Sequence, residues 1–160
     1  MQEDTDHDFV SRTRVHIQRP IATVWPLLRD LGAWKEGGAP RHHAGTPGAE
    51  GEVLLAHEGP VRDDGSRLRL WLKVLRQQPP QQLVLKLWTE GGDPARGYAD
   101  LSLHPAPGGC EFVYSVFVQT RSLTLTPAEH AVASENIRAE SEARFVREHL
   151  RLKALAEGVA

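Results

Sequence analysis

The sequence predicts an α+β domain in which one curved antiparallel sheet is covered on one face by a long C-terminal helix. About six segments of alternating apolar and polar residues follow one another, separated by turns rich in glycine and proline. The helical signals lie outside this run, a short one after the first strand and a long one at the end. Consecutive hairpins form an antiparallel sheet, whose apolar face has to be buried against another element.

The C-terminal helix is predicted over residues 126–158. Thr126 is a typical N-cap, Pro127 suits the first helical position, and Glu129 completes a capping box. The pattern continues unbroken to Gly158, a residue typical of the position just beyond a helix. About 31 residues at ~1.5 Å each give a helix of roughly 46 Å, which is long enough to cover the sheet.

The two faces of this helix are assigned from the helical period. The stripe expected to face the sheet consists of Ala128, Ala131, Val132, Ala139, Ala143, Val146 and Leu150. The face expected to meet solvent consists of Glu140, Arg144, Arg147, Glu148 and Arg151, with Glu140 and Arg144 spaced as an i,i+4 ion pair. Small residues fill the first half of the stripe. The helix is therefore expected to pack tightly at its C-terminal half and to roof a space at its N-terminal half.

A second apolar patch on this helix consists of Phe145, Leu152 and Leu155. It predicts a contact with the first helix of the domain or with another chain, and a homodimer would result in the second case.

The remaining elements follow from alternation and turn signals. Strands are expected at residues 12–18, 40–45, 52–58, 67–76, 82–89, 97–104 and 110–120. A short helix is expected at residues 24–31, with Thr23 as its N-cap and Pro26 in its first turn, followed by one more turn at residues 33–36. Both faces of the last strand are apolar, so the pattern does not say which face lies inside.

Composition narrows the class of protein. The chain has 160 residues, which fits a disordered tail at residues 1–10 and a single domain at residues 11–160. Its 19 basic and 21 acidic residues argue against nucleic acid as the main partner. Cys110 is the single cysteine, so no internal disulfide can form. An acidic N-terminus without an apolar run, and the lack of a stretch that could span a bilayer, predict a cytoplasmic protein.

Several short motifs then suggest a family. They are Val15-x-Ile17, the run Pro20-Ile-Ala-Thr-Val-Trp25, Asp30, Trp34, the link Gly48-Ala-Glu-Gly51-Glu-Val53 and the helix end Leu152-Lys-Ala-Leu155-Ala-Glu157. Over residues 11–158 the chain resembles the helix-grip fold of the START-like superfamily, the SRPBCC group. Its members include polyketide cyclase/dehydrase-like proteins, pollen-allergen relatives and lipid-transfer domains. Pro26, directly after the tryptophan, departs from the pattern and is expected to shorten or shift the first helix.

The resemblance implies a sheet of about six to seven strands wrapped around the C-terminal helix, with one or two short helices after the first strand. It also implies a cavity between sheet and helix for an apolar or amphipathic small molecule. It carries over no catalytic residue, because pocket residues vary within this superfamily.

No catalytic or metal motif stands out. The chain has no phosphate-binding glycine loop in a strand-to-helix context and no Gly-x-Ser-x-Gly elbow. His42 and His43 are adjacent on a predicted strand and point to opposite faces, so they do not suit one metal ion. We therefore expect neither a metal nor a cofactor.

The best candidate for chemistry is Glu135, beside Asn136 on the C-terminal helix. These residues either face the space under the helix or border solvent. A carboxylate facing an apolar cavity has to be paired, hydrogen-bonded or neutralised. Glu135 could then anchor a hydroxyl or amine of a ligand, or act as a general base with a raised pKa. His57 and Tyr114 are its candidate partners.

The residues expected to contact a ligand share an inward position on their strand or helix. They are Val53, Leu55, His57, Leu70, Leu72, Leu85, Leu87, Leu101, Tyr114, Val116, Val132, Glu135, Asn136 and Ala139. Trp71 and Trp88 lie opposite the leucine faces of their strands. They are either surface residues, part of a contact with a partner, or a sign that the inside and outside of the sheet are exchanged.

Three functions are compatible with these observations. The first hypothesis is a carrier or sensor that binds a hydrophobic or amphipathic molecule, lipid- or polyketide-like, in the cavity. The second is an enzyme of the polyketide cyclase/aromatase type that uses a cavity acid or base and no metal. The third is a protein-interaction module that uses Trp71, Trp88 or the Phe145 patch. We expect a binding protein rather than an enzyme.

Overall fold

The computed structural model describes residues 7–59, 61–90, 95–120 and 124–158. The strands are β1 (His7–Ile17), β2 (Arg41–Ala44), β3 (Val53–Glu58), β4 (Leu68–Gln78), β5 (Gln82–Thr89), β6 (Ala95–Ala106) and β7 (Gly109–Thr120). The helices are α1 (Ile21–Arg29), α2 (Leu31–Trp34) and α3 (Pro127–Glu157). β1 begins at His7, within the segment expected to be a disordered tail, and the rest of that tail lies outside the described residues.

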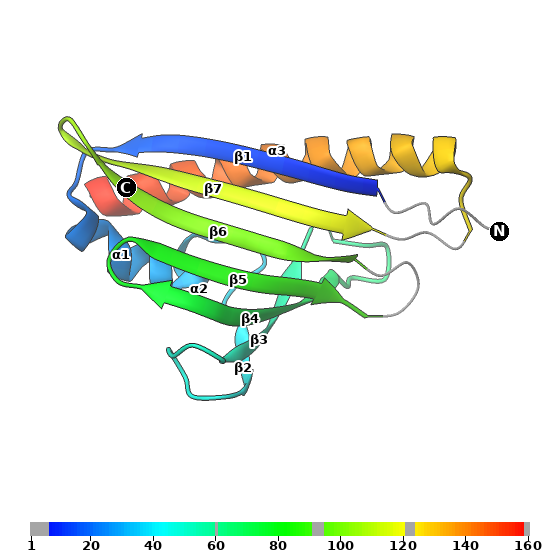
Figure 1. The fold of residues 1–160 in the computed structure, drawn as a ribbon, viewed down its shortest axis with the longest axis horizontal. Coiled ribbons are helices and arrows are strands. Elements are labelled where there is room, and N and C mark those ends of the chain that lie inside the picture. Colours follow the sequence, from blue (N-terminus) through cyan, green and yellow to red (C-terminus); the bar gives the residue numbers. More distant parts are fainter. Residues whose placement is uncertain (1–6, 60, 91–94, 121–123, 159–160) are drawn as a thin grey trace.

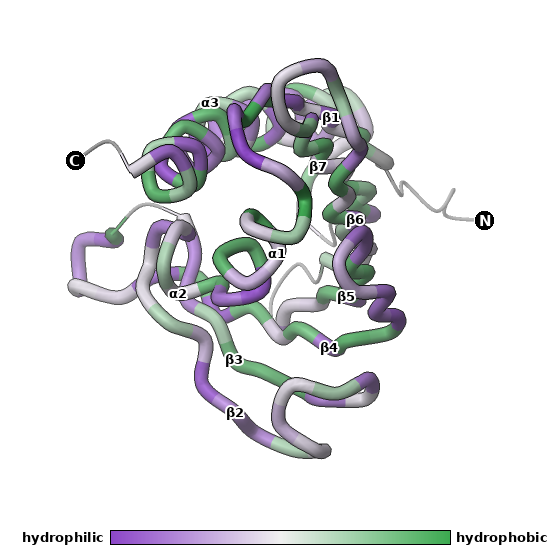
Figure 2. The backbone as a smooth tube through the Cα atoms, turned by 90° about the vertical axis from the view of Figure 1, so that its left-hand side faces the viewer, coloured by the Kyte–Doolittle hydropathy of each residue, from purple (hydrophilic) through white to green (hydrophobic). Residues whose placement is uncertain are grey.

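The described strands form one antiparallel sheet in the order β1-β7-β6-β5-β4-β3-β2 (Figure 1). Every neighbouring pair is antiparallel. Seen from the end in Figure 2, the sheet curves from β7 round to β2, with α1 and α2 inside the curve and α3 close to β1. The predicted fold class, a curved antiparallel sheet with a long C-terminal helix, is confirmed.

The leucine-rich strands bury the faces that their alternation predicts. Leu70, Leu72 and Val74 of β4 are buried, as are Leu83, Leu85 and Leu87 of β5. Gly97 of β6 lies on the same inner face. Any larger residue would clash there, because a Cβ atom would lie 1.8 Å from the carbonyl oxygen of Phe117 in β7. The structure also shows which face of β7 lies inside the domain. The core cluster contains Phe112, Tyr114, Val116 and Val118.

Trp34 anchors the short helices in the core. Its indole N–H donates a hydrogen bond of 3.0 Å to the carbonyl oxygen of Leu28, and its ring meets the edge of Phe112 at 5.8 Å. α1 starts at Ile21 after Pro20, so Thr23 is not the N-cap and Pro26 lies inside the helix instead of in its first turn. The expected extra turn at residues 33–36 is α2, which ends at Trp34.

The ends of α3 are those the sequence predicts. Thr126 accepts a hydrogen bond from the backbone N–H of Glu129, whose carboxylate accepts one from the N–H of Thr126. Gly158 caps the C-terminus in the left-handed conformation, with a φ of 70°. These local signals act within a few residues of the chain, which is why they can be read without the fold.

The face of α3 that packs on the sheet is not the predicted one. Val132 of the predicted stripe is 63% exposed, and Val146 and Leu150 are exposed as well. The buried residues are His130, Ser134, Ser141, Phe145, Glu148, His149, Leu152 and Ala156. Glu148, expected in solvent, is 1% exposed. The prediction was wrong because polar residues on the buried face have partners on other elements.

The three residues of the second apolar patch on α3 do not share one environment. Phe145 and Leu152 are buried within the chain, whereas Leu155 is exposed. Two of its three side chains are therefore not available for contact with another chain.

Candidate functional site

A cavity of about 290 Å³ lies between the inner face of the sheet and α3. Its walls are mostly apolar and include Leu70, Leu72, Leu85, Leu87, Leu101 and Val116. On the helix side it is lined by residues between His130 and Phe145. Since one water needs only about 10–15 Å³ of such volume, the cavity has room for an organic molecule.

The expected division of α3 into two halves is confirmed. Its first part lies over the cavity, and small side chains there, Ala133, Ser134 and Ser141, leave the space open. Beyond Phe145, the buried His149, Leu152 and Ala156 pack against the rest of the domain.

Part of the cavity lining is exposed to solvent. Three of its lining residues, Leu68, Leu125 and Ile137, are exposed large hydrophobic side chains. Apolar side chains at the rim of an apolar cavity offer a path along which a hydrophobic molecule can enter with little contact with water. Beside the start of α3, at what we call the outer end of the cavity, Thr120 Oγ1 lies 2.7 Å from His130 Nε2 and 3.4 Å from Ser134 Oγ. This end therefore carries polar groups.

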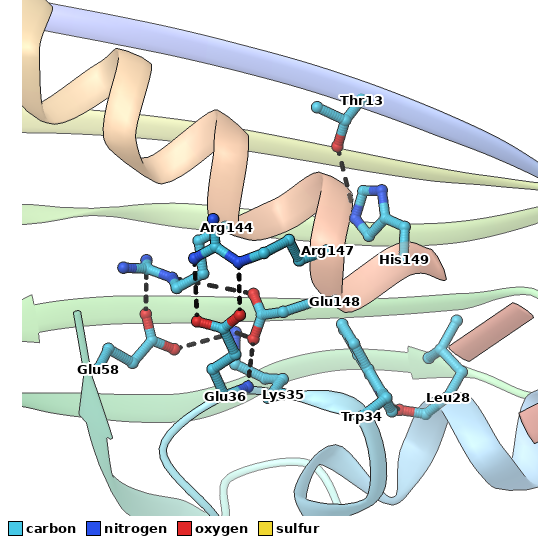
Figure 3. A network of polar contacts seen from close by, with 10 residues as sticks. All are labelled: Thr13, Leu28, Trp34, Lys35, Glu36, Glu58, Arg144, Arg147, Glu148 and His149. Atoms are coloured by element: carbon cyan, nitrogen blue, oxygen red, sulfur yellow. Dashed lines mark hydrogen bonds and ion pairs between the residues drawn. The ribbon is translucent and has the colours of Figure 1, made fainter. Parts of the chain in front are cut away.

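Four charged side chains meet further along α3 (Figure 3), at what we call the inner end of the cavity. Lys35 Nζ lies 2.9 Å from Glu58 Oε1 and 3.9 Å from Glu148 Oε2. Arg144 Nη2 lies 3.2 Å from Glu58 Oε2, and Arg144 Nε lies 3.9 Å from Glu148 Oε1. We call Lys35, Glu58, Arg144 and Glu148 the inner ionic cluster. Lys35, Glu58 and Arg144 line the cavity.

The inner ionic cluster joins three parts of the fold. Glu58 ends β3, Lys35 follows α2, and the other two members lie one turn apart on α3. The backbone N–H of Glu36 donates a 2.8 Å hydrogen bond to Glu148 Oε2, and Arg147 Nε lies 2.7 Å from Glu36 Oε1. These contacts fix α3 to the segment after α2 (Figure 3).

Mutual pairing keeps the Lys35–Glu58 pair charged. Burial lowers the pKa of Lys35, but the charges of Glu58, Tyr114 and Glu148 outweigh burial and raise it above its ordinary value. Burial raises the pKa of Glu58, but the nearby Lys35 and Arg144 outweigh it and lower that pKa. For Glu148 burial dominates and raises the pKa.

Aromatic rings and a neutral histidine surround the cluster. Burial raises the pKa of Tyr114, which lines the cavity, to about 12. Burial, with a further contribution from the charge of Lys35, lowers the pKa of His149 to about 4. His149 Nε2 lies 3.4 Å from Thr13 Oγ1, and its ring meets the edge of Phe112 at 4.9 Å. At neutral pH Tyr114 is therefore protonated and His149 uncharged.

Half of the residues predicted to contact a ligand line this cavity. They are Leu70, Leu72, Leu85, Leu87, Leu101, Tyr114 and Val116. The other half, Val53, Leu55, His57, Val132, Glu135, Asn136 and Ala139, do not line it. β3 turns Leu54, Ala56 and Glu58 inward, so its three predicted residues lie on the opposite face.

Glu135 does not face the cavity. Its side chain is exposed and pairs with Arg138, whose Nε lies 3.0 Å from Glu135 Oε2. Val132, Asn136 and Ala139 are exposed on the same side of α3. The expected position of Glu135 was wrong for the same reason as the assignment of the helix faces.

Sequence reasoning missed the inner ionic cluster. Glu58 shares the inward side of β3 with Leu54 and Ala56, so strict alternation would have placed it inside. Arg144 was assigned to a solvent-facing pair with Glu140, but its partners are Glu58 and Glu148. Lys35 gave no signal apart from its place next to Trp34.

The outward tryptophans are confirmed on the face away from the cavity, so the inside and outside of the sheet are not exchanged. Trp71 stacks on Trp88 with ring centroids 6.3 Å apart, and His43 meets the edge of Trp71 at 4.7 Å. Both tryptophans are half-buried, each covered partly by the other.

Two features are absent from the part of the chain that the structure describes. No group of three or more His, Cys, Asp or Glu side chains is placed to hold a metal ion there. No helix among these residues combines the length and apolar character needed to cross a bilayer.

The fold and the cavity together define a helix-grip protein with an internal space for a hydrophobic ligand. The chain belongs to the family described as polyketide cyclase/dehydrase and lipid transport, whose model matches residues 9–157. The resemblance to the START-like superfamily is thereby confirmed. A comparison with curated proteins found no match.

Solved structures share the fold at low sequence identity. A protein from Mesorhizobium loti is 16% identical, with a TM-score of 0.68 over 95% of this chain and 99% of its own. Ara h 8.0201 is 15% identical, with a TM-score of 0.61 over 96% and 99%. The di-domain ARO/CYC BexL from the BE-7585A biosynthetic pathway is 18% identical, with a TM-score of 0.66, and the match covers 94% of this chain but 50% of BexL.

Proposed function

We propose that this protein binds an uncharged hydrophobic or amphipathic small molecule in the cavity under α3, as a carrier or sensor. The observation that carries the proposal is the cavity of about 290 Å³ with leucine-rich walls and polar groups at both ends. Apolar pockets with a few convergent polar groups are the usual form of small-molecule sites, and this volume is near the lower end of their range. A ligand of one to three fused rings, or a short acyl chain, matches this space.

The inner end favours binding over acid–base catalysis. A general acid or base works best when its pKa is close to the working pH. The pKa of Lys35 is raised, that of Glu58 is lowered and that of Tyr114 is about 12, so none of these three cavity-lining groups is close to neutrality. A cyclase that uses a cavity acid or base remains the alternative that follows from the family.

The proposal is tested by filling the cavity from α3. Ala133 lines the cavity, whereas Ala131 is exposed on the same helix. Ala133→Phe places a ring in the cavity, and Ala131→Phe adds the same ring outside as the matched control. Binding is measured by titration with N-phenyl-1-naphthylamine, an uncharged dye whose fluorescence rises in apolar surroundings.

We expect the parent and Ala131→Phe to bind the dye with similar dissociation constants, and Ala133→Phe to bind at least roughly ten-fold more weakly. Circular dichroism checks that both variants are folded. The proposal is overturned if the folded parent does not bind the dye, or if Ala133→Phe binds it as well as the parent does. Native mass spectrometry of the gently purified protein then identifies any molecule that it carries.

A further inference from the structure

The Tyr114 side chain brings an unused hydrogen-bond donor to the inner end of the cavity. It is 6% exposed and lines the cavity next to Lys35, whose Nζ lies 5.7 Å from the centre of the Tyr114 ring. Among the described residues, none forms a hydrogen bond with its hydroxyl group. The hydroxyl is not fully enclosed by protein atoms, so its place in the cavity wall leaves it able to donate a hydrogen bond to a ligand. With a pKa of about 12, Tyr114 keeps its proton at neutral pH.

The ring that carries this hydroxyl is held firmly. Its neighbours are Phe145 at 4.8 Å, His149 at 5.6 Å and Phe112 at 6.3 Å between ring centres. The contacts with Phe145 and His149 are edge-to-face, the arrangement that aromatic pairs prefer. The donor is therefore positioned before a ligand arrives, which reduces the entropic cost of binding.

The carboxylate that lines the inner end of the cavity is already engaged by other groups. Both oxygens of Glu58 face a cation, Lys35 at 2.9 Å and Arg144 at 3.2 Å. Oε2 of Glu148 accepts the N–H of Glu36. Its Oε1 has no hydrogen-bond partner and lies 3.9 Å from Arg144 Nε, but Glu148 is not among the residues that line the cavity. The inner end thus offers a ligand a donor and no spare carboxylate. An amine would find no free acceptor there.

The formal charges of the inner ionic cluster also cancel, because Lys35 and Arg144 face Glu58 and Glu148. The cluster presents no surplus positive charge that would compensate an anionic head group for its loss of water.

We propose that the inner end of the cavity recognises an uncharged carbonyl oxygen on an otherwise apolar ligand, and that the Tyr114 hydroxyl donates the hydrogen bond to it. The inference rests on the proposed function and adds the chemical class of the ligand. The apolar walls contact the apolar part of the ligand. Tyr114 selects molecules that place a ketone, aldehyde, ester or similar group at the inner end of the cavity.

The test compares two probes that differ in a single group. 2-Acetylnaphthalene carries a carbonyl where 2-ethylnaphthalene carries a methylene, and both compete with N-phenyl-1-naphthylamine for the cavity. Tyr114→Phe removes the hydroxyl and keeps the ring. Tyr98→Phe is the matched control, because Tyr98 is the other tyrosine of the chain, lies on the outer face of β6 and is 50% exposed.

We expect Tyr114→Phe to weaken binding of 2-acetylnaphthalene roughly ten-fold and to leave the binding of 2-ethylnaphthalene unchanged, whereas Tyr98→Phe changes neither. Tyr114→Phe should unfold at no lower urea concentration than the parent, because the hydroxyl has no partner to lose. The inference is overturned if Tyr114→Phe affects both probes equally or affects neither. Failure of the parent to bind the dye would instead remove the proposed function itself, so the two failures are distinguishable.

Discussion

Lys35 places a buried ammonium group within 2.9 Å of Glu58 and 3.9 Å of Glu148. Burying a charge is unfavourable unless it is paired with good geometry, and the pairing here keeps several polar groups inside an otherwise apolar domain. Lys35 also lies 5.6 Å from the centre of the Trp34 ring, the side chain that anchors the short helices. A single residue therefore links the core, the end of β3 and α3.

Removing Lys35 is expected to be costly. Lys35→Met leaves Glu58 buried with Arg144 as its remaining cationic partner, and breaking a buried ion pair from one side typically costs about 3–5 kcal/mol. The matched control is Lys153→Met, because Lys153 pairs with Glu157 at 2.7 Å near the surface, where such pairs contribute about 0–1 kcal/mol. Urea unfolding measures both. Equal losses of stability in the two variants would contradict the role given to the inner ionic cluster.

His149 is expected to make stability depend on pH. Its pKa is about 4 in the folded protein and 6.5 when unperturbed, so between these values the unfolded chain binds more protons than the folded one. Stability should therefore fall as pH decreases from 6.5 towards 4. The raised pKa of Glu148 acts in the opposite direction above 4.5, and the lowered pKa of Glu58 reduces stability only below 4.5.

The measurement isolates the histidine by difference. Urea midpoints are determined from pH 7 down to about pH 5 for the parent and for His149→Phe, so that Glu148 contributes to both curves. We expect the parent to lose stability more steeply than the variant over this range. Parallel curves would show that His149 does not titrate in this way.

Among the elements, β4 and β5 followed their sequence pattern, whereas β3 and α3 did not. β4 and β5 bury the leucines that alternation places inside, and these side chains belong to the apolar core cluster. α3 buries Ser134, Ser141, Glu148 and His149 and exposes Val132, because its polar side chains find partners on β1, β7 and the segment after α2. A helical wheel is drawn from the sequence of the helix alone, so it contains no information about partners on other elements.

Two leucines of α3 test which face is buried. Leu150, in the stripe that the sequence predicts, is 54% exposed, and Leu152 is 0% exposed. We expect Leu152→Ala to cost about 2–5 kcal/mol of stability and Leu150→Ala to stay within about 0.5 kcal/mol of the parent, measured by urea unfolding. A larger loss of stability for Leu150→Ala than for Leu152→Ala would instead support the buried stripe predicted from the sequence.

At the scale of the whole molecule, the curvature of the sheet produces the cavity. β1 and β7 lie near α3, whereas β4 and β5 curve away from it (Figure 2). Leu31 of α2 and Lys35, which follows this helix, line the cavity. Small side chains on α3 do not fill the space between the helix and the sheet. This unfilled space is the candidate ligand site. A sequence pattern records which residues are apolar, but not the distance between two curved layers.

The sequence alone predicts the order and type of the elements, the caps of α3, the inward leucines of β4 to β6 and the family. Each of these depends on neighbours along the chain or on a repeated period. The folded structure is needed to see which face of α3 is buried and which charges meet at the inner end. Glu36 and Glu148, for example, are joined by a hydrogen bond across 112 positions of the chain. A buried polar side chain is stable only when such a distant partner satisfies it, so its place cannot be inferred from its own segment.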